Sequence, residues 1–160
     1  FALALRSSRV FPSRWFSSVP RLPPCTAPLS SSAASALYKG QDLDTANLPA
    51  SRRAGLRLGI STHDHAELDR ALSLSPDYIA LGPVYPTILK KMKWAEQGLD
   101  RVTEWKARIG DTPLCAIGGM KTERDAGAFA AGADTVAAVT DITLNPAPEA
   151  RMRDWLEVCA

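Results

Sequence analysis

The chain has 160 residues, of which 46% are hydrophobic and 22% are charged, and its formal net charge is +2. This balance is typical of one globular domain and differs from that of disordered or nucleic-acid-binding chains. No stretch approaches the roughly 20 consecutive apolar residues of a membrane-spanning helix. We therefore expect neither nucleic acid nor a membrane as a partner.

The first 37 residues differ in composition from the rest. They contain no acidic residue, and arginines are interspersed with serines at positions 6, 9, 14 and 21. This bias is typical of an organellar transit peptide. The alternative is a leader whose prolines prevent folding. Under either interpretation we expect residues 1–37 to lie outside the fold. Because the chain begins with Phe1, we expect a fragment.

From Tyr38 onward, short apolar runs alternate with amphipathic segments, which is the pattern of βαβ units. The predicted parallel strands are residues 56–60, 78–81, 114–117 and 135–139. Covering helices are predicted over residues 67–74 and 99–109, where apolar residues recur at helical spacing.

Two more helices are predicted near the C-terminus. Thr122 and Asp125 resemble a capping box that opens a short helix, which Gly132 ends. A final helix from about residue 148 carries an apolar stripe that we interpret as core packing: Met152, Trp155, Leu156 and Cys159.

The alternation of strands and helices predicts an α/β fold, either a barrel or an open doubly wound sheet. Periodicity does not choose between them. A complete (β/α) barrel needs roughly 250 residues, so this chain has room for only part of one.

The predicted ligand-binding residues directly follow the strands, because ligands of parallel α/β folds gather at the carboxyl ends of strands. Gly118 and Gly119 form a candidate phosphate site, since glycine lets backbone N–H groups approach an anion. The alternative is a tight turn that needs positive φ. Val139 and Thr140 would supply the other side of the site.

Residues 86–91 form a predicted loop over the same end of the sheet. This loop carries a hydroxyl at Thr87 and adjacent charges at Lys90 and Lys91, which suits a polyanion, whereas the alternative is a solvated basic loop.

The histidines and cysteines show no metal-binding pattern. His63 and His65 lack an evident third ligand, so we do not favour a metal there. The three cysteines follow no metal or redox spacing, and Cys115 lies in a run that we interpret as a buried strand, which fits a reduced compartment.

Four ordered segments resemble the thiamine-phosphate synthase family: LRLGISTHDHAELDRAL, YIALGPVYPTILKKMKWAEQGL, PLCAIGGM and GADTVAAVTDI. The resemblance covers residues 41–142 and implies a partial TIM (β/α) barrel made of roughly the last four to five strand-helix units. It also implies magnesium-assisted condensation of hydroxymethylpyrimidine diphosphate with thiazole phosphate, which releases pyrophosphate.

The resemblance implies roles for individual residues. Asp42, in GQDLDTA, is the implied magnesium ligand, and a carboxylate suits that ion. Ser61 and Lys90 are implied to act in catalysis at the pyrophosphate, which Thr87 would also contact. The thiazole phosphate is implied to bind at Gly118, Gly119, Val139 and Thr140.

The chain also departs from the family pattern. Leu89 stands where many relatives have a second threonine, and Gln41-Asp42 is one residue shorter than the family's Gln-Glu-Asp. The earlier barrel strands, with a basic patch and an Asn-Asp pair, have no counterpart before Tyr38. We therefore expect the chain to be inactive alone, and its open half barrel to favour self-association.

The composition of residues 1–37 favours an organellar location, and the resemblance slightly favours the plastid over the mitochondrion. Three other functions stay open. They are a tautomerase-like protein that keeps the glycine-turn phosphate site, a non-catalytic half barrel that pairs with another chain, and an unrelated phosphate-binding barrel.

Overall fold

The structure is a computed structural model that describes residues 3–6, 35–39, 48–53, 55, 57–88 and 95–158. Of residues 3–6, 35–39 and 51 it describes the backbone alone. The strands are β1 (Leu3–Arg6), β2 (Ser35–Lys39), β3 (Arg57–Thr62), β4 (Tyr78–Leu81), β5 (Leu114–Ile117) and β6 (Thr135–Ala138). The helices are α1 (Leu48–Arg53), α2 (His65–Ser73), α3 (Gly98–Ile109), α4 (Asp125–Ala130), α5 (Thr140–Thr143) and α6 (Pro148–Val158).

The strands form one sheet in the order β1-β6-β5-β4-β3-β2. From β3 to β6 each strand pairs in parallel with the strand before it in the sequence, whereas β1 pairs with β6 in antiparallel fashion. A doubly wound sheet would reverse this order at a switch point. The unreversed order is that of a sector of a (β/α) barrel, so the predicted fold class is confirmed.

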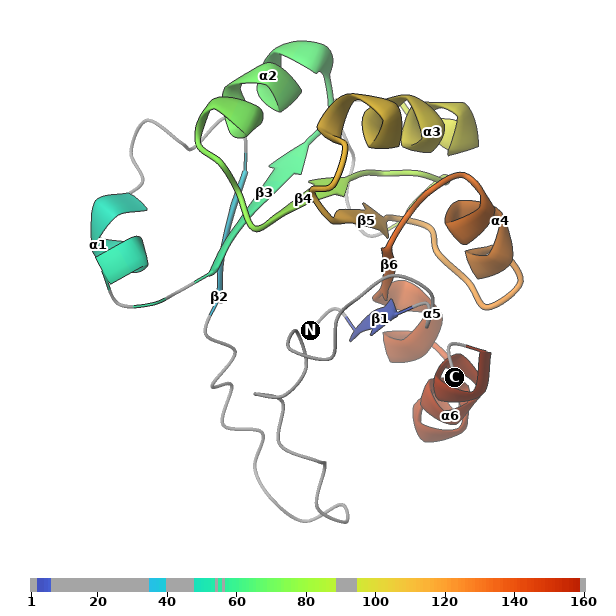
Figure 1. The fold of residues 1–160 in the computed structure, drawn as a ribbon. Helices are drawn as coiled ribbons and strands as arrows, with labels where there is room; N and C mark the ends of the chain where they lie inside the picture. The colour runs from blue at the N-terminus through green and yellow to red at the C-terminus, as the bar shows by residue number, and fades with distance from the viewer. Residues whose placement is uncertain are drawn as a thin grey trace.

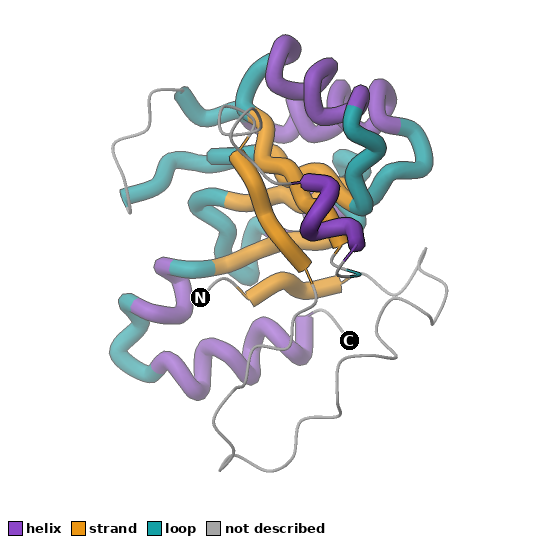
Figure 2. The backbone as a smooth tube through the Cα atoms, turned by 90° about the vertical axis from the view of Figure 1, so that its left-hand side faces the viewer, coloured by secondary structure: helices purple, strands orange, loops and turns teal. Residues whose placement is uncertain are grey.

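The helices that follow β3, β4 and β5 lie on one side of the sheet. Figure 1 shows α2, α3 and α4 in an arc over its outer face, with α5 and α6 beyond β6. Figure 2, turned by 90°, shows the strands lying side by side. Every parallel strand therefore ends at the same edge of the sheet, which is where its connecting loop begins.

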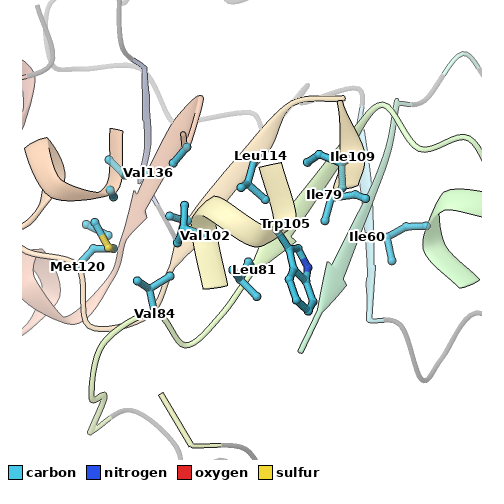
Figure 3. Packing of buried hydrophobic residues seen from close by; sticks show 14 of the residues in the cluster. Ile60, Ile79, Leu81, Val84, Val102, Trp105, Ile109, Leu114, Met120 and Val136 are labelled. Carbon is cyan, nitrogen blue, oxygen red and sulfur yellow. The ribbon is translucent and has the colours of Figure 1, made fainter. Parts of the chain in front are cut away.

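The main core lies between the sheet and these helices. Trp105 and Val102 of α3 project toward Leu81 of β4 and Leu114 of β5, as Figure 3 shows, and none of these side chains is exposed. The indole Nε1 of Trp105 donates a hydrogen bond to Thr62 Oγ1 at 2.9 Å. This bond ties α3 to β3 across the core.

The opposite face of the sheet buries a smaller cluster around Ala80, Cys115 and Ala137. Burial raises the pKa of the Cys115 thiol to about 12, so the group stays protonated at neutral pH. The prediction that Cys115 lies in a buried strand is confirmed, and its protonated thiol is a poor nucleophile.

The boundaries of β3 and α2 differ slightly from their predictions. Ser61, predicted to follow the strand, lies within β3. Helix α2 begins two residues early because Asp64 caps it: Asp64 Oδ1 accepts a bond from Glu67 N at 2.8 Å. Glu67 Oε2 in turn accepts a bond from His63 N at 2.9 Å. These two bonds satisfy backbone N–H groups at the start of α2, so the helix begins at His65.

The predicted capping box at Thr122 and Asp125 is wrong. Helix α4 begins at Asp125, and its N-cap, Arg124, makes no capping bond with its side chain. Thr122 Oγ1 donates instead to Glu123 Oε1 at 3.1 Å. The predicted stop is confirmed, since Gly132 adopts φ +106° just after the helix.

The predicted core stripe of α6 is correct only at Trp155, which is fully buried. Met152 is 42% exposed and Leu156 is 48% exposed, so the prediction is wrong for both, and Cys159 lies outside the described residues. Helix α6 packs against α5. The face that carries Trp155 makes this contact, which leaves the neighbouring apolar side chains outside it.

Contrary to our expectation, residues 1–37 do not lie wholly outside the fold. Leu3–Arg6 pairs with β6, and β2 begins at Ser35, before the predicted domain start at Tyr38. The role of residues 1–37 as an organellar transit peptide stays a prediction. Among the described residues, no helix is long and apolar enough to cross a membrane.

Candidate phosphate-binding site

A pocket of about 380 Å³ opens at the carboxyl ends of β4, β5 and β6. Three segments line it, each of which follows one of these strands. They contribute Pro86, Thr87 and Ile88; Gly119, Met120, Lys121 and Arg124; and Thr140, Asp141, Leu144, Asn145 and Pro146. This is the end of a parallel sheet where ligands bind.

Gly119 brings the first two of these segments together. Its φ is +63°, and a Cβ atom built on it would lie 2.5 Å from Pro86 O and 2.7 Å from Tyr85 O. No L-residue with a side chain fits so close to backbone atoms. The turn after β5 therefore touches the loop after β4 because the residue is glycine. The positive φ is that of the predicted tight turn, and phosphate binding at this turn stays a prediction.

Arg124 fixes the turn from its other side. Its Nη1 donates a hydrogen bond to Gly119 O at 2.6 Å, and its guanidinium carbon lies 4.6 Å from the centre of the Tyr85 ring. Stacking on an aromatic face and bonding to a carbonyl hold a guanidinium in one orientation. A positive charge is thus held at the wall of the pocket.

The charges that line the pocket favour an anion. Lys121 and Arg124 bring positive charge, and Asp141 is the acidic residue of the lining. The Asp141 carboxylate accepts bonds from Arg151 Nε and from Trp155 Nε1, each at 2.8 Å. Because Arg151 neutralises Asp141, the local charge is positive and suits a phosphate.

The structure brings together three of the predicted site residues. Thr87, Gly119 and Thr140 line one pocket, although 20 or more residues separate them in the chain. Gly118 and Val139 each directly precede a lining residue, but neither lines the pocket itself.

The remaining predicted site residues lie elsewhere. Ser61 is half-buried in β3, which lies next to β4 on the side away from β5. It does not line the pocket. Asp42 and Lys90 lie outside the described residues, as does Leu89. Their predicted roles stay predictions.

Sequence reasoning missed Lys121, Arg124 and Asn145, which also line the pocket. A signal was present for two of them, since Lys121 and Arg124 closely follow the glycine pair at the end of β5. The loop around a phosphate-binding turn is where cationic side chains are expected.

The two histidines lie in separate contacts, each with its own carboxylate. His63 Nδ1 is 2.8 Å from Glu67 Oε2, whereas His65 Nε2 pairs with Glu104 of α3. Bonding to His65 holds the pKa of Glu104 below its usual range. The pair of His63 lies at the start of α2, and the pair of His65 links α2 with α3.

The magnesium ligand that the resemblance implies, Asp42, lies outside the described residues. No group of three histidine, cysteine or acidic side chains gathers in the part of the chain that the structure describes. Asp141, the acidic residue of the pocket, is already paired with Arg151 and Trp155. Magnesium is usually held by one or two carboxylates together with substrate phosphates, so a site built around Asp42 needs no such group.

A sequence model of one protein family, thiamine monophosphate synthase, matches residues 37–142, well over half of the chain. The chain belongs to this thiamine monophosphate synthase family. The matched residues include every strand from β3 to β6. They also include the residues that line the pocket from Pro86 to Asp141.

Curated members of the thiamine monophosphate synthase family are similar to the chain over much of its length. Thiamine-phosphate synthase of Rhizobium etli is 58% identical over 125 residues, which cover 78% of this chain and 61% of that protein. The Neisseria meningitidis serogroup A enzyme is 49% identical over 110 residues, 69% of this chain and 54% of that protein. The chain thus spans between half and two thirds of these relatives.

Solved structures support the fold. Thiamine phosphate pyrophosphorylase from Pyrococcus furiosus matches with a TM-score of 0.64 and 17% identity, over 79% of this chain and 59% of that one. A 3-hexulose-6-phosphate synthase matches with a TM-score of 0.59 and 14% identity, over 78% of this chain and 61% of that one. At such identities the likeness concerns the fold alone.

Proposed function

We propose that the protein acts in thiamine biosynthesis, in the condensation of hydroxymethylpyrimidine diphosphate with thiazole phosphate to give thiamine phosphate and pyrophosphate. The observation that carries this proposal is the positively charged pocket where Thr87, Gly119 and Thr140 meet, in a chain of this family. In the reaction, the thiazole nitrogen attacks the pyrimidine methylene carbon, and the bond from that carbon to the diphosphate oxygen breaks.

The pocket supplies contacts for the thiazole phosphate. Lys121 and Arg124 offset the charge of a dianion, and the hydroxyl-bearing residues Thr87 and Thr140 stand on opposite walls. Gly119 lets the turn after β5 lie against the loop after β4, so that both segments reach the same phosphate. Holding the phosphate in this way orients the thiazole nitrogen toward the second substrate.

Ser61 and Lys90 belong to the second part of the proposal, the binding of the diphosphate. Magnesium, with Asp42 as a ligand, would offset the charge of the departing pyrophosphate when it is bound. Since the chain spans only part of its relatives, we further propose that activity needs a first-half barrel in addition to these residues.

Pyrophosphate release tests this function. The 160-residue chain receives both substrates and magnesium, alone and mixed with the first half of the barrel of a relative. We expect release only in the mixture, because the chain spans only 61% and 54% of these relatives. Release by the chain alone would contradict the need for a partner. Silence in both, with thiazole phosphate bound, would favour the tautomerase-like alternative or a non-catalytic half barrel.

Arg124→Gln is expected to weaken the binding of thiazole phosphate on the order of tenfold, because it removes a charge and a charge-assisted bond to Gly119 O. Titration calorimetry measures this effect. Arg124→Lys keeps the charge but loses the stacking on Tyr85, so we expect an intermediate affinity. Unchanged affinity in Arg124→Gln would remove this residue from the site.

A further inference from the structure

Helix α6 does not line the pocket, but it contacts two of the segments that do. We call these segments, which follow β5 and β6, the two walls of the pocket. Helix α6 places Arg151 within reach of two carboxylates on other segments, besides Asp154 on its own helix. Arg151 Nε lies 2.8 Å from Asp141 Oδ2 and its Nη2 lies 3.2 Å from Asp141 Oδ1, so the pair is bidentate. The same Nη2 lies 3.2 Å from Glu123 Oε1.

These two carboxylates belong to different walls. Asp141 lines the pocket and directly follows Thr140 at the start of α5. Glu123 lies in the turn after β5, directly before Arg124. One guanidinium therefore connects the segment after β6 with the segment after β5.

The connection is held firmly on the side of Asp141. The side chain of Asp141 is only 9% exposed and that of Arg151 is 16% exposed, whereas Glu123 is 68% exposed. Trp155, one turn further along α6 and fully buried, donates its Nε1–H to Asp141 Oδ2 at 2.8 Å. Bidentate geometry and low exposure make such a pair more rigid than a surface ion pair.

We propose that Arg151 is a positioning residue, which holds Asp141 neutralised at the wall of the phosphate pocket. This inference rests on the proposed function, in taking the pocket as the site of the thiazole phosphate. Without Arg151, Asp141 keeps a poorly solvated negative charge beside the bound phosphate, and the charges repel each other. The loss therefore acts on the affinity for phosphate even where the fold survives.

Calorimetric titration of the 160-residue chain with thiazole phosphate and, separately, with inorganic phosphate tests the proposal. We expect Arg151→Gln to weaken both affinities on the order of tenfold. The matched control is Arg153→Gln, which removes an exposed arginine from the same helix and is expected to bind as the wild type does. Arg151→Lys restores the charge without the fork and should recover part of the affinity.

The double variant Arg151→Gln/Asp141→Asn separates positioning from general damage. Because it removes the unpaired carboxylate, it should bind phosphate more tightly than Arg151→Gln alone, whereas a merely destabilised helix would give no such recovery. Wild-type affinity in Arg151→Gln, or no recovery in the double variant, overturns the inference. Absence of phosphate binding by the wild type overturns the pocket assignment as well. Binding without pyrophosphate release, even in the mixture with a first-half barrel, counts against the proposed function and leaves the inference in place.

Discussion

Gly119→Ala is expected to lower kcat/KM for thiazole phosphate about 100-fold or more, in the mixture that releases pyrophosphate, because a misplacement of about 1 Å in a binding turn can cost that much. The added Cβ would lie 2.5 Å from Pro86 O and 2.7 Å from Tyr85 O. Both contacts are with backbone, so the turn after β5 or the loop after β4 must shift. Steady-state kinetics measures the loss, and calorimetry of phosphate binding shows whether it lies in affinity.

Gly110→Ala is the matched control for this substitution. Gly110 has φ +59°, close to the +63° of Gly119, but a Cβ there would meet nothing within 4 Å. Alanine there carries the cost of a positive φ, of order 1–3 kcal/mol, without a clash at the pocket. Its affinity for phosphate should be unchanged. If the two variants lose affinity equally, the close approach of the two loops does not matter for binding.

The largest expected effect on stability comes from Trp105→Ala, which should lower the free energy of unfolding by about 3–5 kcal/mol. Trp105 is fully buried between α3 and the sheet, and its removal leaves a cavity where α3 covers β3 and β4. Domains of this size have a total stability of about 5–15 kcal/mol, so the variant loses a large part of it. Urea denaturation measures this loss. It is followed by far-UV circular dichroism, because removing a tryptophan changes the intrinsic fluorescence of the protein.

Trp105→Phe divides this loss into packing and hydrogen bonding. Phenylalanine fills most of the volume but cannot donate to Thr62 Oγ1, so we expect a smaller loss of about 1–2 kcal/mol beyond the reduced packing. Thr62 Oγ1 itself still donates to Ala80 O at 3.2 Å. A loss below about 1 kcal/mol in Trp105→Ala would contradict the placement of α3 over the core.

Much of the site could be predicted because it depends on local sequence. The strands β4 and β5 and the helix α3 follow from apolar periodicity, which reflects burial on one face of an element. Once the strands are parallel, the residues after them must meet at one edge, so Thr87, Gly119 and Thr140 could be predicted to converge.

Predictions failed where a side chain had more than one available partner. Thr122 was expected to cap α4 but bonds to Glu123, and Met152 and Leu156 were expected in the core but are exposed. In each case the local pattern permits both outcomes. The choice depends on which neighbouring element packs against the helix, and periodicity carries no information on that neighbour.

By itself, the sequence determined that the protein has parallel strands with covering helices, that a glycine turn lies at a strand end, and that the chain resembles thiamine-phosphate synthase. Only the tertiary structure decided that the sheet winds in an unreversed order as a barrel sector, that Arg124 stacks on Tyr85 beside the turn, and that Arg151 links both walls of the pocket. The physical reason is range. Backbone conformation and amphipathicity act over a few residues, whereas strand order and ion pairs between distant segments arise only when the whole core packs.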